Sequence, residues 1–425
     1  MTVHEITAQA AAAQRAWAVT PFTERAAVLR RAGDLFVERA DVLADALIRE
    51  AVSTPAKAHF EVGLAAQDCH EAAVLPSHAA GEVLAGEEDR LSFYERVPVG
   101  VVGVIAPYNA PIELAVRSVA PALALGNAVV LKPDPRTSTA GGDIIAAIFA
   151  EAGLPGGVLH VLKGGATKGA ELVADPRVSV ICFTGSTSSG RQVAELAARH
   201  LKRVHLELGG NSALIVLDDA DLEKAVEAGA FGSFFHQGQV CMAVGRHLVH
   251  KSLYDRYITM LGAVADRTPA GPIIDERQLA RIHEIVTTSV HAGARLIAGG
   301  GHTGLHYRPT VLADVPPHAP AFTQEIFGPV APVTPFGDDD EAVKLACDTD
   351  YGLSLGVLTR DVMRGLALAK RIPAGMVHIN DQTIDAAAHV PFGGVKSSGA
   401  GSRVGGSANL DAFTETRWVT VRGGQ

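Results

Sequence analysis

The chain has 425 residues, too many for one simple hydrophobic core, so two or more domains are expected. It is 48% hydrophobic and 20% charged, and its net charge of −9 argues against a nucleic-acid or anionic-membrane partner. The four cysteines form neither a CxxC pair nor a Cys/His metal spacing, which argues against a zinc site and a disulfide framework.

The start of the chain, MTVHEITAQAAAAQRAW, has neither the basic region nor the apolar run of a secretory signal. A membrane span needs about 18 uncharged apolar residues in a row, and no segment provides them. Because thiols stay reduced in the cytosol, the default expectation is a cytoplasmic protein.

Helical patterns come first along the chain, and strands alternate with helices afterwards. Helical spacing of apolar residues predicts helices over 24–50, as one helix or two abutting ones, and over 56–80. Residues 91–107 turn to β character. Further strands are predicted over 128–133, 158–164, 178–186 and 204–217, separated by helices over 138–155, 167–174, 188–202 and 221–235. This alternation predicts a parallel sheet covered on both faces.

A second βα series follows residue 241 and predicts a second α/β domain. The series comprises the segments 247–250, 277–294, 295–300, 309–315, 340–349, 354–360, 362–372 and 375–380. The alternating segment 413–423 suits an edge strand. Together with 91–98 it could form a small sheet that adds to the sheet of another subunit.

Polar residues and glycines follow two of the predicted buried strands. Lys132 ends one strand, where ligands bind in open α/β sheets, and it could donate to ribose hydroxyls or a phosphate. Gly185 and Ser186 lead into a helix whose N-terminus suits a diphosphate. The alternatives are a solvated lysine and a plain helix cap formed by Ser186 or Ser188. No GxGxxG fingerprint follows a strand.

Two further polar residues could serve catalysis. Asn109 lies in a loop between a strand and a helix, where its amide could donate to a developing oxyanion or act as a turn residue. Glu207 lies in an otherwise apolar strand before two glycines. Burial would raise its pKa toward the range of a general base, unless it is a satisfied core acid.

The stretch FHQGQVCMAVGR, 235–246, places Cys241 after a glycine between two glutamines. Gly238 lets another group approach the backbone closely, and an electropositive site would favour a nucleophilic thiolate. The other cysteines, Cys69, Cys182 and Cys347, lie in apolar or helical patterns that suit packing.

Two loops in the second half carry candidate ligand contacts. Glu325 could hold a ribose hydroxyl and Phe327 could pack on a cofactor ring. Phe392, in a Gly-rich loop, could line a pocket. The alternatives are an ordinary loop with a hydrophobic anchor and a residue that fills a domain interface.

A group of motifs in this order resembles the NAD(P)-dependent aldehyde dehydrogenase superfamily: VVGVIAPYNAP, NAVVLKP, FTGSTSSG, LELGGNS, HQGQVC, QEIFGPV and PFGGVKSSG. They cover nearly the whole chain. The resemblance implies an α/β fold of two Rossmann-like parallel-sheet domains with a small β oligomerisation flap. It places a cofactor-binding domain at 1–90 and 99–237, a catalytic domain at 238–398, and oligomerisation strands at 91–98 and 399–425.

The resemblance also implies roles for individual residues. Cys241 matches the nucleophile, Glu207 the base that activates the deacylating water, and Asn109 with the Cys241 amide the oxyanion hole. The NAD or NADP site is expected to comprise Ile105, Ala106, Pro107, Tyr108, Lys132, Pro135, Gly165, Phe183, Gly185, Ser186, Leu208, Gly209, Glu325 and Phe327. No metal is expected.

The segments KPDPRTS, HLKRVHLELGGNSALIVLDDADLE and HQGQVCMAVGRHLVH look most like the benzaldehyde, vanillin and salicylaldehyde dehydrogenase branch. The expected reaction is the oxidation of an aromatic aldehyde to its acid through a thiohemiacetal and a thioester. The expected substrate pocket comprises Leu114, Arg117, Phe235, Val240 and Phe392. A tunnel arginine would favour a ring with a hydroxyl or carboxylate, unless Arg117 only forms an ion pair.

The sequence also departs from the family pattern. Pro135 stands where many NAD-preferring members carry an acidic residue, and Arg136 follows, so NADP is expected to be tolerated beside NAD. Tyr108 replaces the usual Trp, and 262–274 looks shortened. A homodimer or homotetramer is expected. The alternatives are a CoA-acylating semialdehyde dehydrogenase and a shortened, catalytically impaired binding or structural protein.

Overall fold

The computed structural model describes residues 1–78, 80–86 and 89–422, and the chain forms two compact units. The first unit comprises Met1–Leu206, Ala387–Phe392 and Gly401–Gln425, and the second Glu207–Ala386 and Gly393–Ala400. The main change of unit therefore falls between Leu206 and Glu207. The functional boundary predicted at 237/238 stays a prediction.

The first unit begins with four helices: α1 (Val3–Val19), α2 (Phe22–Glu38), α3 (Ala40–Glu50) and α4 (Pro55–Ala72). The predicted segment 24–50 is thus two abutting helices. Thr2 and Glu5 form a capping box on α1, and Thr54 caps α4 ahead of Pro55. Residue 79 of the predicted 56–80 helix lies outside the described residues.

The main sheet of the first unit runs in the order β7-β6-β3-β4-β5. These strands are β3 (Val101–Ile105), β4 (Ala128–Lys132), β5 (Leu159–Val161), β6 (Val178–Thr184) and β7 (Arg203–Glu207), and the connecting helices are α5 (Glu113–Ala124), α6 (Ile144–Glu151), α7 (Ala166–Ala174) and α8 (Thr187–Arg199). The chain moves outward from β3 to β5 and then returns to β6 on the other side of β3. Ligands of open α/β sheets bind at such a reversal of strand order.

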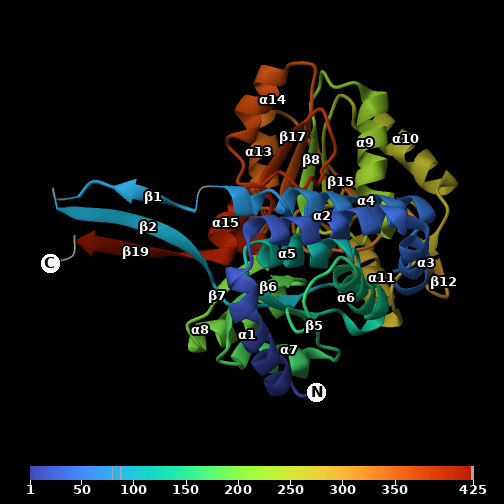
Figure 1. The fold of residues 1–425 in the computed structure, drawn as a ribbon. Coiled ribbons are helices and arrows are strands. Elements are labelled where there is room, and N and C mark those ends of the chain that lie inside the picture. Colours follow the sequence, from blue (N-terminus) through green and yellow to red (C-terminus); the bar gives the residue numbers. More distant parts are fainter. Residues whose placement is uncertain (79, 87–88, 423–425) are drawn as a thin grey trace. The chain divides into compact units, whose positions relative to one another are not determined.

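Three strands form a separate antiparallel ribbon in the first unit: β1 (Gly81–Leu84), β2 (Arg90–Pro98) and β19 (Thr414–Arg422), shown in Figure 1. The predicted pairing of 91–98 with the C-terminal strand is confirmed, and β1 was not predicted. Residue 423 of the predicted strand lies outside the described residues. Trp418 pairs with Tyr94 and donates its indole N–H to the Ser92 hydroxyl over 2.9 Å.

The second unit contains a sheet in the order β11-β14-β15-β9-β8-β16-β17, parallel except for the edge strand β11. Its strands are β8 (Ser212–Val216), β9 (Val244–His250), β11 (Arg295–Ala298), β14 (Thr310–Ala313), β15 (Val330–Phe336), β16 (Ser354–Leu358) and β17 (Met376–Ile379). The principal helices are α9 (Leu222–Phe234), α10 (Tyr254–Arg267), α11 (Glu276–His291), α13 (Asp339–Cys347) and α14 (Val362–Ala369). The predicted second α/β domain is confirmed.

Both faces of this second sheet are covered. Ile215 of β8 packs with residues of α11, α13 and α14, whereas its neighbours Leu214 and Val216 pack with residues of α9 and α10. Successive strand residues point to opposite faces, so this division follows from the period of a strand. It explains why the strands are apolar throughout rather than alternating.

Three sequence predictions are refined by the structure. The predicted strand 204–217 is two strands, β7 and β8, which belong to different sheets. The predicted helix 138–155 begins with a π-helical turn at Thr139–Asp143 before α6. The segment 262–274 contains the end of α10 and the short strand β10 (Gly271–Pro272). Among the described residues, no helix combines the length and apolarity that a bilayer crossing requires.

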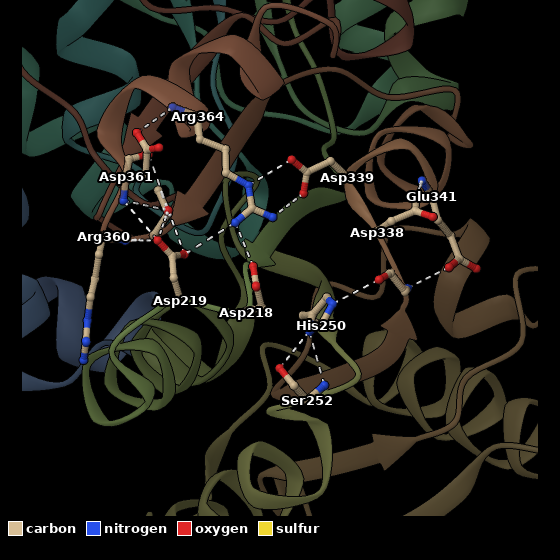
Figure 2. A network of polar contacts seen from close by, with 12 residues as sticks. Asp218, Asp219, His250, Ser252, Asp338, Asp339, Glu341, Arg360, Asp361 and Arg364 are labelled. Atoms are coloured by element: carbon tan, nitrogen blue, oxygen red, sulfur yellow. Dashed lines mark hydrogen bonds and ion pairs between the residues drawn. The ribbon is translucent and has the colours of Figure 1, made fainter.

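An ion network joins elements of the second unit around Arg364 on α14, shown in Figure 2. The guanidinium lies 2.6 Å from Asp339 and 2.7 Å from Asp218. Hydrogen bonds with both carboxylates raise the pKa of Arg364. Asp219 also accepts a hydrogen bond from the backbone amide of Arg360. The network ties α13 and α14 to the loop after β8.

Candidate active site

Cys241 follows a tight loop between α9 and β9. Before it, the 3₁₀ turn η4 (Phe235–Gly238) holds His236, Gln237 and Gly238 at φ of 50°, 54° and 66°. Left-handed backbone is uncommon for residues other than glycine and persists only where the surroundings enforce it. A Cβ at Gly238 would lie 2.1 Å from the carbonyl oxygen of Gly328. The loop therefore has little freedom, and Cys241 is half-buried.

The turn after Glu207 touches the backbone of Cys241. A Cβ at Gly210 would lie 2.3 Å from the Cys241 carbonyl oxygen, so only glycine permits this approach. Glu207 ends β7 and is buried, with 8% of its surface exposed. The structure therefore brings the segments of the predicted base and nucleophile together in the second unit. Their assignment as base and nucleophile stays a prediction.

Arg246, on β9, supports the same turn. It is buried and donates to the carbonyl oxygens of Asn211, Leu345 and Ala346 over 3.1, 2.9 and 3.1 Å. Burial lowers its pKa to about 10, so it remains charged at neutral pH. Sequence reasoning missed this residue, although a charge inside an apolar strand is a signal that could have found it.

Asn109 belongs to the first unit and lies in the loop between β3 and α5, with 6% of its surface exposed. Its backbone carbonyl accepts a hydrogen bond of 2.6 Å from Lys57 Nζ. The carboxylate of Glu61 accepts from the amide of Ile112 over 2.8 Å. Lys57 and Glu61 were also missed from the sequence. Their signal was a pair of charges four residues apart in a helix that buries most of its surface.

Arg117, predicted for the substrate pocket, lies on α5 and is buried. Its guanidinium is 2.9 Å from the carboxylate of Glu113, and its central carbon is 4.7 Å from the ring centroid of Phe392. Asp68 belongs to the same cluster, because the charges of Arg117 and Glu113 both act on its carboxylate. Burial raises the pKa of Asp68 to about 8; the charge of Arg117 opposes this rise and that of Glu113 adds to it. The structure thus shows the ion pair that sequence reasoning named as the alternative role of Arg117.

The remaining predicted pocket residues divide between the units. Leu114 is half-buried in the first turn of α5, in the same unit as Arg117 and Phe392. Phe235 and Val240 are half-buried beside the Cys241 loop in the second unit, where Phe235 stacks on Phe231 with ring centroids 4.9 Å apart. A pocket formed by all five predicted residues stays a prediction.

Three predicted cofactor residues are neighbours at the carboxyl ends of adjacent parallel strands. Ile105 on β3 pairs in register with Lys132 on β4 and with Phe183 on β6. They lie at the reversal of strand order, where α/β sheets bind ligands. Burial lowers the pKa of Lys132, whose ammonium donates to the Pro133 carbonyl over 3.2 Å.

The donors that follow these strands suit a dinucleotide. Ser186 caps α8, a helix of 13 residues whose N-terminal amides favour a phosphate. Gly165 caps α7, and a Cβ built there would meet no atom within 4 Å. Ala106 and Pro107 continue from β3 at the same edge of the sheet. A lysine for hydroxyl groups and a helix end for a diphosphate fit the group that the sequence predicts.

Arg136, beside the predicted contact Pro135, has partners of its own. It donates to both carboxylate oxygens of Asp134 over 2.9 Å and lies 4.2 Å from the ring centroid of Tyr108. Burial alone would raise the pKa of Asp134, and the hydrogen bonds from Arg136 bring it below its usual value. The charge next to Pro135 is therefore partly neutralised.

In the second unit, Glu325 lies against the turn that carries two other predicted contacts, Leu208 and Gly209. Its Oε1 accepts from the Gly210 amide over 3.1 Å, and a Cβ at Gly209 would lie 2.3 Å from Oε2. Burial raises the pKa of Glu325 to about 7, against the lowering effects of the Gly210 amide and Arg281.

Phe327 follows at a φ of 54°, and its loop is held by α11. Gln278 donates to the carbonyl oxygens of Ile326 and Phe327 over 3.1 and 3.0 Å. These bonds fix the backbone next to Glu325, so the loop is a rigid support for the two predicted cofactor contacts.

Comparisons with known proteins show the family of this chain. The model of the aldehyde dehydrogenase family matches residues 1–419. A vanillin dehydrogenase of Amycolatopsis sp. is 63% identical over 98% of this chain and 88% of its own. The NAD(+) benzaldehyde dehydrogenase of Pseudomonas putida is 49% identical over 96% of this chain and 86% of its own.

A solved structure gives the same result. The salicylaldehyde dehydrogenase of Pseudomonas putida G7, complexed with salicylaldehyde, superposes with a TM-score of 0.96 at 33% identity, covering 100% of this chain and 91% of that chain. The chain belongs to the aldehyde dehydrogenase family and is an NAD(P)-dependent oxidoreductase. The predicted family and its α/β fold are thereby confirmed.

Proposed function

We propose that this protein oxidises an aromatic aldehyde, of the benzaldehyde or vanillin kind, to its carboxylic acid with NAD or NADP. The observation that carries the mechanism is the close approach of the Cys241 backbone to the turn after Glu207, which Gly210 permits. The aromatic substrate class is supported by relatives named vanillin and benzaldehyde dehydrogenase at 63% and 49% identity.

In the proposed reaction, the Cys241 thiolate adds to the aldehyde carbon, and the carbonyl π electrons move onto oxygen. A nicotinamide cofactor held by Lys132 and Ser186 would supply the hydride acceptor, and loss of hydride from the tetrahedral carbon would leave a thioester on Cys241. Glu207 removes a proton from water, which attacks the thioester and releases the acid and the thiolate. The covalent step separates oxidation from hydrolysis.

Asn109 is proposed to stabilise the oxyanion of the first step. A preorganised donor of this kind lowers the barrier by about 3–4 kcal/mol. Its side chain belongs to a loop whose backbone is anchored at Asn109 and Ile112, as such preorganisation requires.

Use of both NAD and NADP is proposed because no carboxylate occupies position 135. Lys132 would donate to the adenosine ribose, and Ser186 with the N-terminal amides of α8 would hold the diphosphate. Arg136 follows Pro135 directly and is the cation proposed to lie near the ribose 2′-phosphate of NADP. Its pairing with Asp134 limits how strongly it favours that phosphate.

Self-association and compartment are proposed on separate grounds. The ribbon of β1, β2 and β19 exposes apolar side chains at Val83, Leu91, Trp418 and Val421, which supports a homodimer or homotetramer formed through it. A nucleophilic thiol needs a reducing environment, which supports the cytoplasm. Sedimentation equilibrium of the protein and of Trp418→Glu tests the assembly, which the substitution is expected to weaken.

The activity test follows reduced nicotinamide absorbance with benzaldehyde, vanillin and an aliphatic aldehyde, with NAD and with NADP. We expect higher kcat/KM for the aromatic aldehydes and loss of turnover in Cys241→Ser. Glu207→Gln is expected to give one burst of reduced nicotinamide followed by slow turnover. Coenzyme A is expected to leave the product unchanged. An unaltered rate in Cys241→Ser would overturn the proposal.

A further inference from the structure

A buried ion pair on α4 contacts both ends of the segment that carries Asn109. Lys57 Nζ lies 2.5 Å from Glu61 Oε2 and donates to the Asn109 carbonyl over 2.6 Å. Glu61 Oε1 accepts from the amides of Ile112 over 2.8 Å and Glu113 over 3.3 Å. The pair thus bonds to the backbone at both ends of residues 109–113.

Because Lys57 and Glu61 are buried, both charged groups need a full set of hydrogen bonds. The side chain of Lys57 is 5% exposed and that of Glu61 is 1% exposed. A buried ion pair is retained only when further hydrogen bonds satisfy both groups, because desolvation of the charges costs several kcal/mol. Lys57 uses its three N–H donors on Ser53 Oγ, Glu61 and the Asn109 carbonyl. Both carboxylate oxygens of Glu61 are bonded as well.

The geometry of the contacts explains why this pair controls a side chain that it does not touch. A hydrogen bond to the Asn109 carbonyl restrains the peptide plane after Asn109, and bonds to the next amides restrain the entry into α5. With both ends anchored, the Cα–Cβ direction of Asn109 is restrained too. Donors placed for an oxyanion act through such fixed geometry, and a shift of about 1 Å can cost 100-fold in rate.

We infer that Lys57 and Glu61 are positioning residues for the oxyanion donor Asn109, an inference that rests on the proposed function. They act on the oxyanion through the placement of Asn109 and not by contact with the substrate. The loop of the oxyanion donor is therefore set by charges from α4, a helix that precedes it by about fifty positions in the chain.

The test is a double-mutant cycle in the full-length protein, with benzaldehyde and NAD. The measured quantity is the single-turnover rate of reduced nicotinamide formation. Lys57→Met is expected to lower this rate about 10- to 100-fold with little change in KM. In an Asn109→Ala background, Lys57→Met is expected to change the rate less than about 2-fold, because the donor that it positions is absent.

Two controls keep the test decisive. Arg25→Met removes a different cation of the first unit, which is half-buried and donates to the carbonyl oxygens of Thr20 and Ala124. It is expected to lower Tm without lowering the rate. If Lys57→Met fails to fold because Glu61 is left charged, Lys57→Met with Glu61→Gln removes both charges and keeps an oxygen for the Ile112 amide. The double variant is expected to show the same rate loss.

The outcomes separate the two claims. A normal rate in Asn109→Ala removes the proposed oxyanion role and the inference built on it. A slow Asn109→Ala with a normal Lys57 variant overturns the positioning role alone, as does a Lys57 effect that is equally large with and without Asn109. A rate loss in the Arg25 variant equal to that of the Lys57 variant also overturns it, since any lost cation would then suffice.

Discussion

The loops of the two principal catalytic candidates are held in different ways. The Asn109 loop is anchored by two charged side chains, Lys57 and Glu61, which form hydrogen bonds with its backbone carbonyl and amide groups. The Cys241 loop is held by close backbone packing, with glycines at 210 and 238 where a Cβ would collide. Charge anchors respond to removal of a charge, whereas packing contacts respond to added volume.

Added volume at the packed loop is expected to give the largest effect. Gly210→Ala would place a Cβ 2.3 Å from the Cys241 carbonyl oxygen, so the loop must shift. We expect kcat/KM to fall about 100-fold or more, as for a 1 Å misplacement of a reacting group. Steady-state kinetics measure the loss. Gly301→Ala, where a Cβ meets no atom within 4 Å, is the control and should keep normal activity.

Glu325, which lies against the glycine turn beside the Cys241 loop, tests whether a titrating group there affects cofactor binding. Since its pKa is raised to about 7, the carboxylate becomes available for ribose hydroxyls only as the pH rises through that value. The KM for NAD is expected to fall as the pH increases from 6 to 8. Glu325→Gln should raise KM about 10-fold at pH 8, the scale of one hydrogen bond to a charged group. It should also abolish the pH trend; a trend that persisted would assign it elsewhere.

In the first unit, the Asp134–Arg136 ion pair is expected to influence the choice between NAD and NADP. Asp134→Asn weakens the neutralisation of Arg136 and removes a negative charge next to Pro135. The ratio of kcat/KM for NADP to that for NAD is expected to rise about 5-fold, in line with about 1 kcal/mol for a partly exposed ion pair. Arg136→Met should lower the same ratio, and a ratio unmoved by either change would contradict the proposed 2′-position contact.

Asp68 gives the smallest expected effect, on stability rather than rate. Its folded-state pKa of about 8 exceeds the unfolded value of 3.8, so the folded form binds the extra proton between these values. The contribution of Asp68 to stability therefore falls as the pH rises from about 4 to 8 and stays constant above that. Asp68→Asn is expected to raise the free energy of unfolding at pH 8 and to change it little at pH 4, as measured by chemical denaturation at both values. An equal gain at both would exclude this titration.

Much of the fold followed from local patterns. The alternation of apolar strands and helices predicted both α/β sheets, since strands buried on both faces are apolar throughout, as β4 and β8 are. The break of 204–217 into β7 and β8 was not predicted, because Gly209 and Gly210 interrupt one apolar run without changing its composition. Which sheet each half joins depends on long-range pairing that no local pattern encodes.

The candidate site divides along the same line. Short motifs around Cys241, Glu207, Asn109 and Lys132 predicted the chemical groups of the site, because each reactive group lies in one short continuous segment of the chain. The supports were not visible there: Lys57 lies 52 positions before the carbonyl that it holds, and Arg246 binds carbonyls about 100 positions away.

The sequence by itself determined the family, the two α/β sheets and the chemical groups of the site, since helix and strand periods and loop motifs are local properties. Only the tertiary structure decided what holds those groups. It paired Lys57 with Glu61 beneath Asn109, packed Gly210 against Cys241 and gave Arg117 a carboxylate partner. Buried charges and close backbone contacts depend on which distant segments meet, and that is settled by packing of the whole unit.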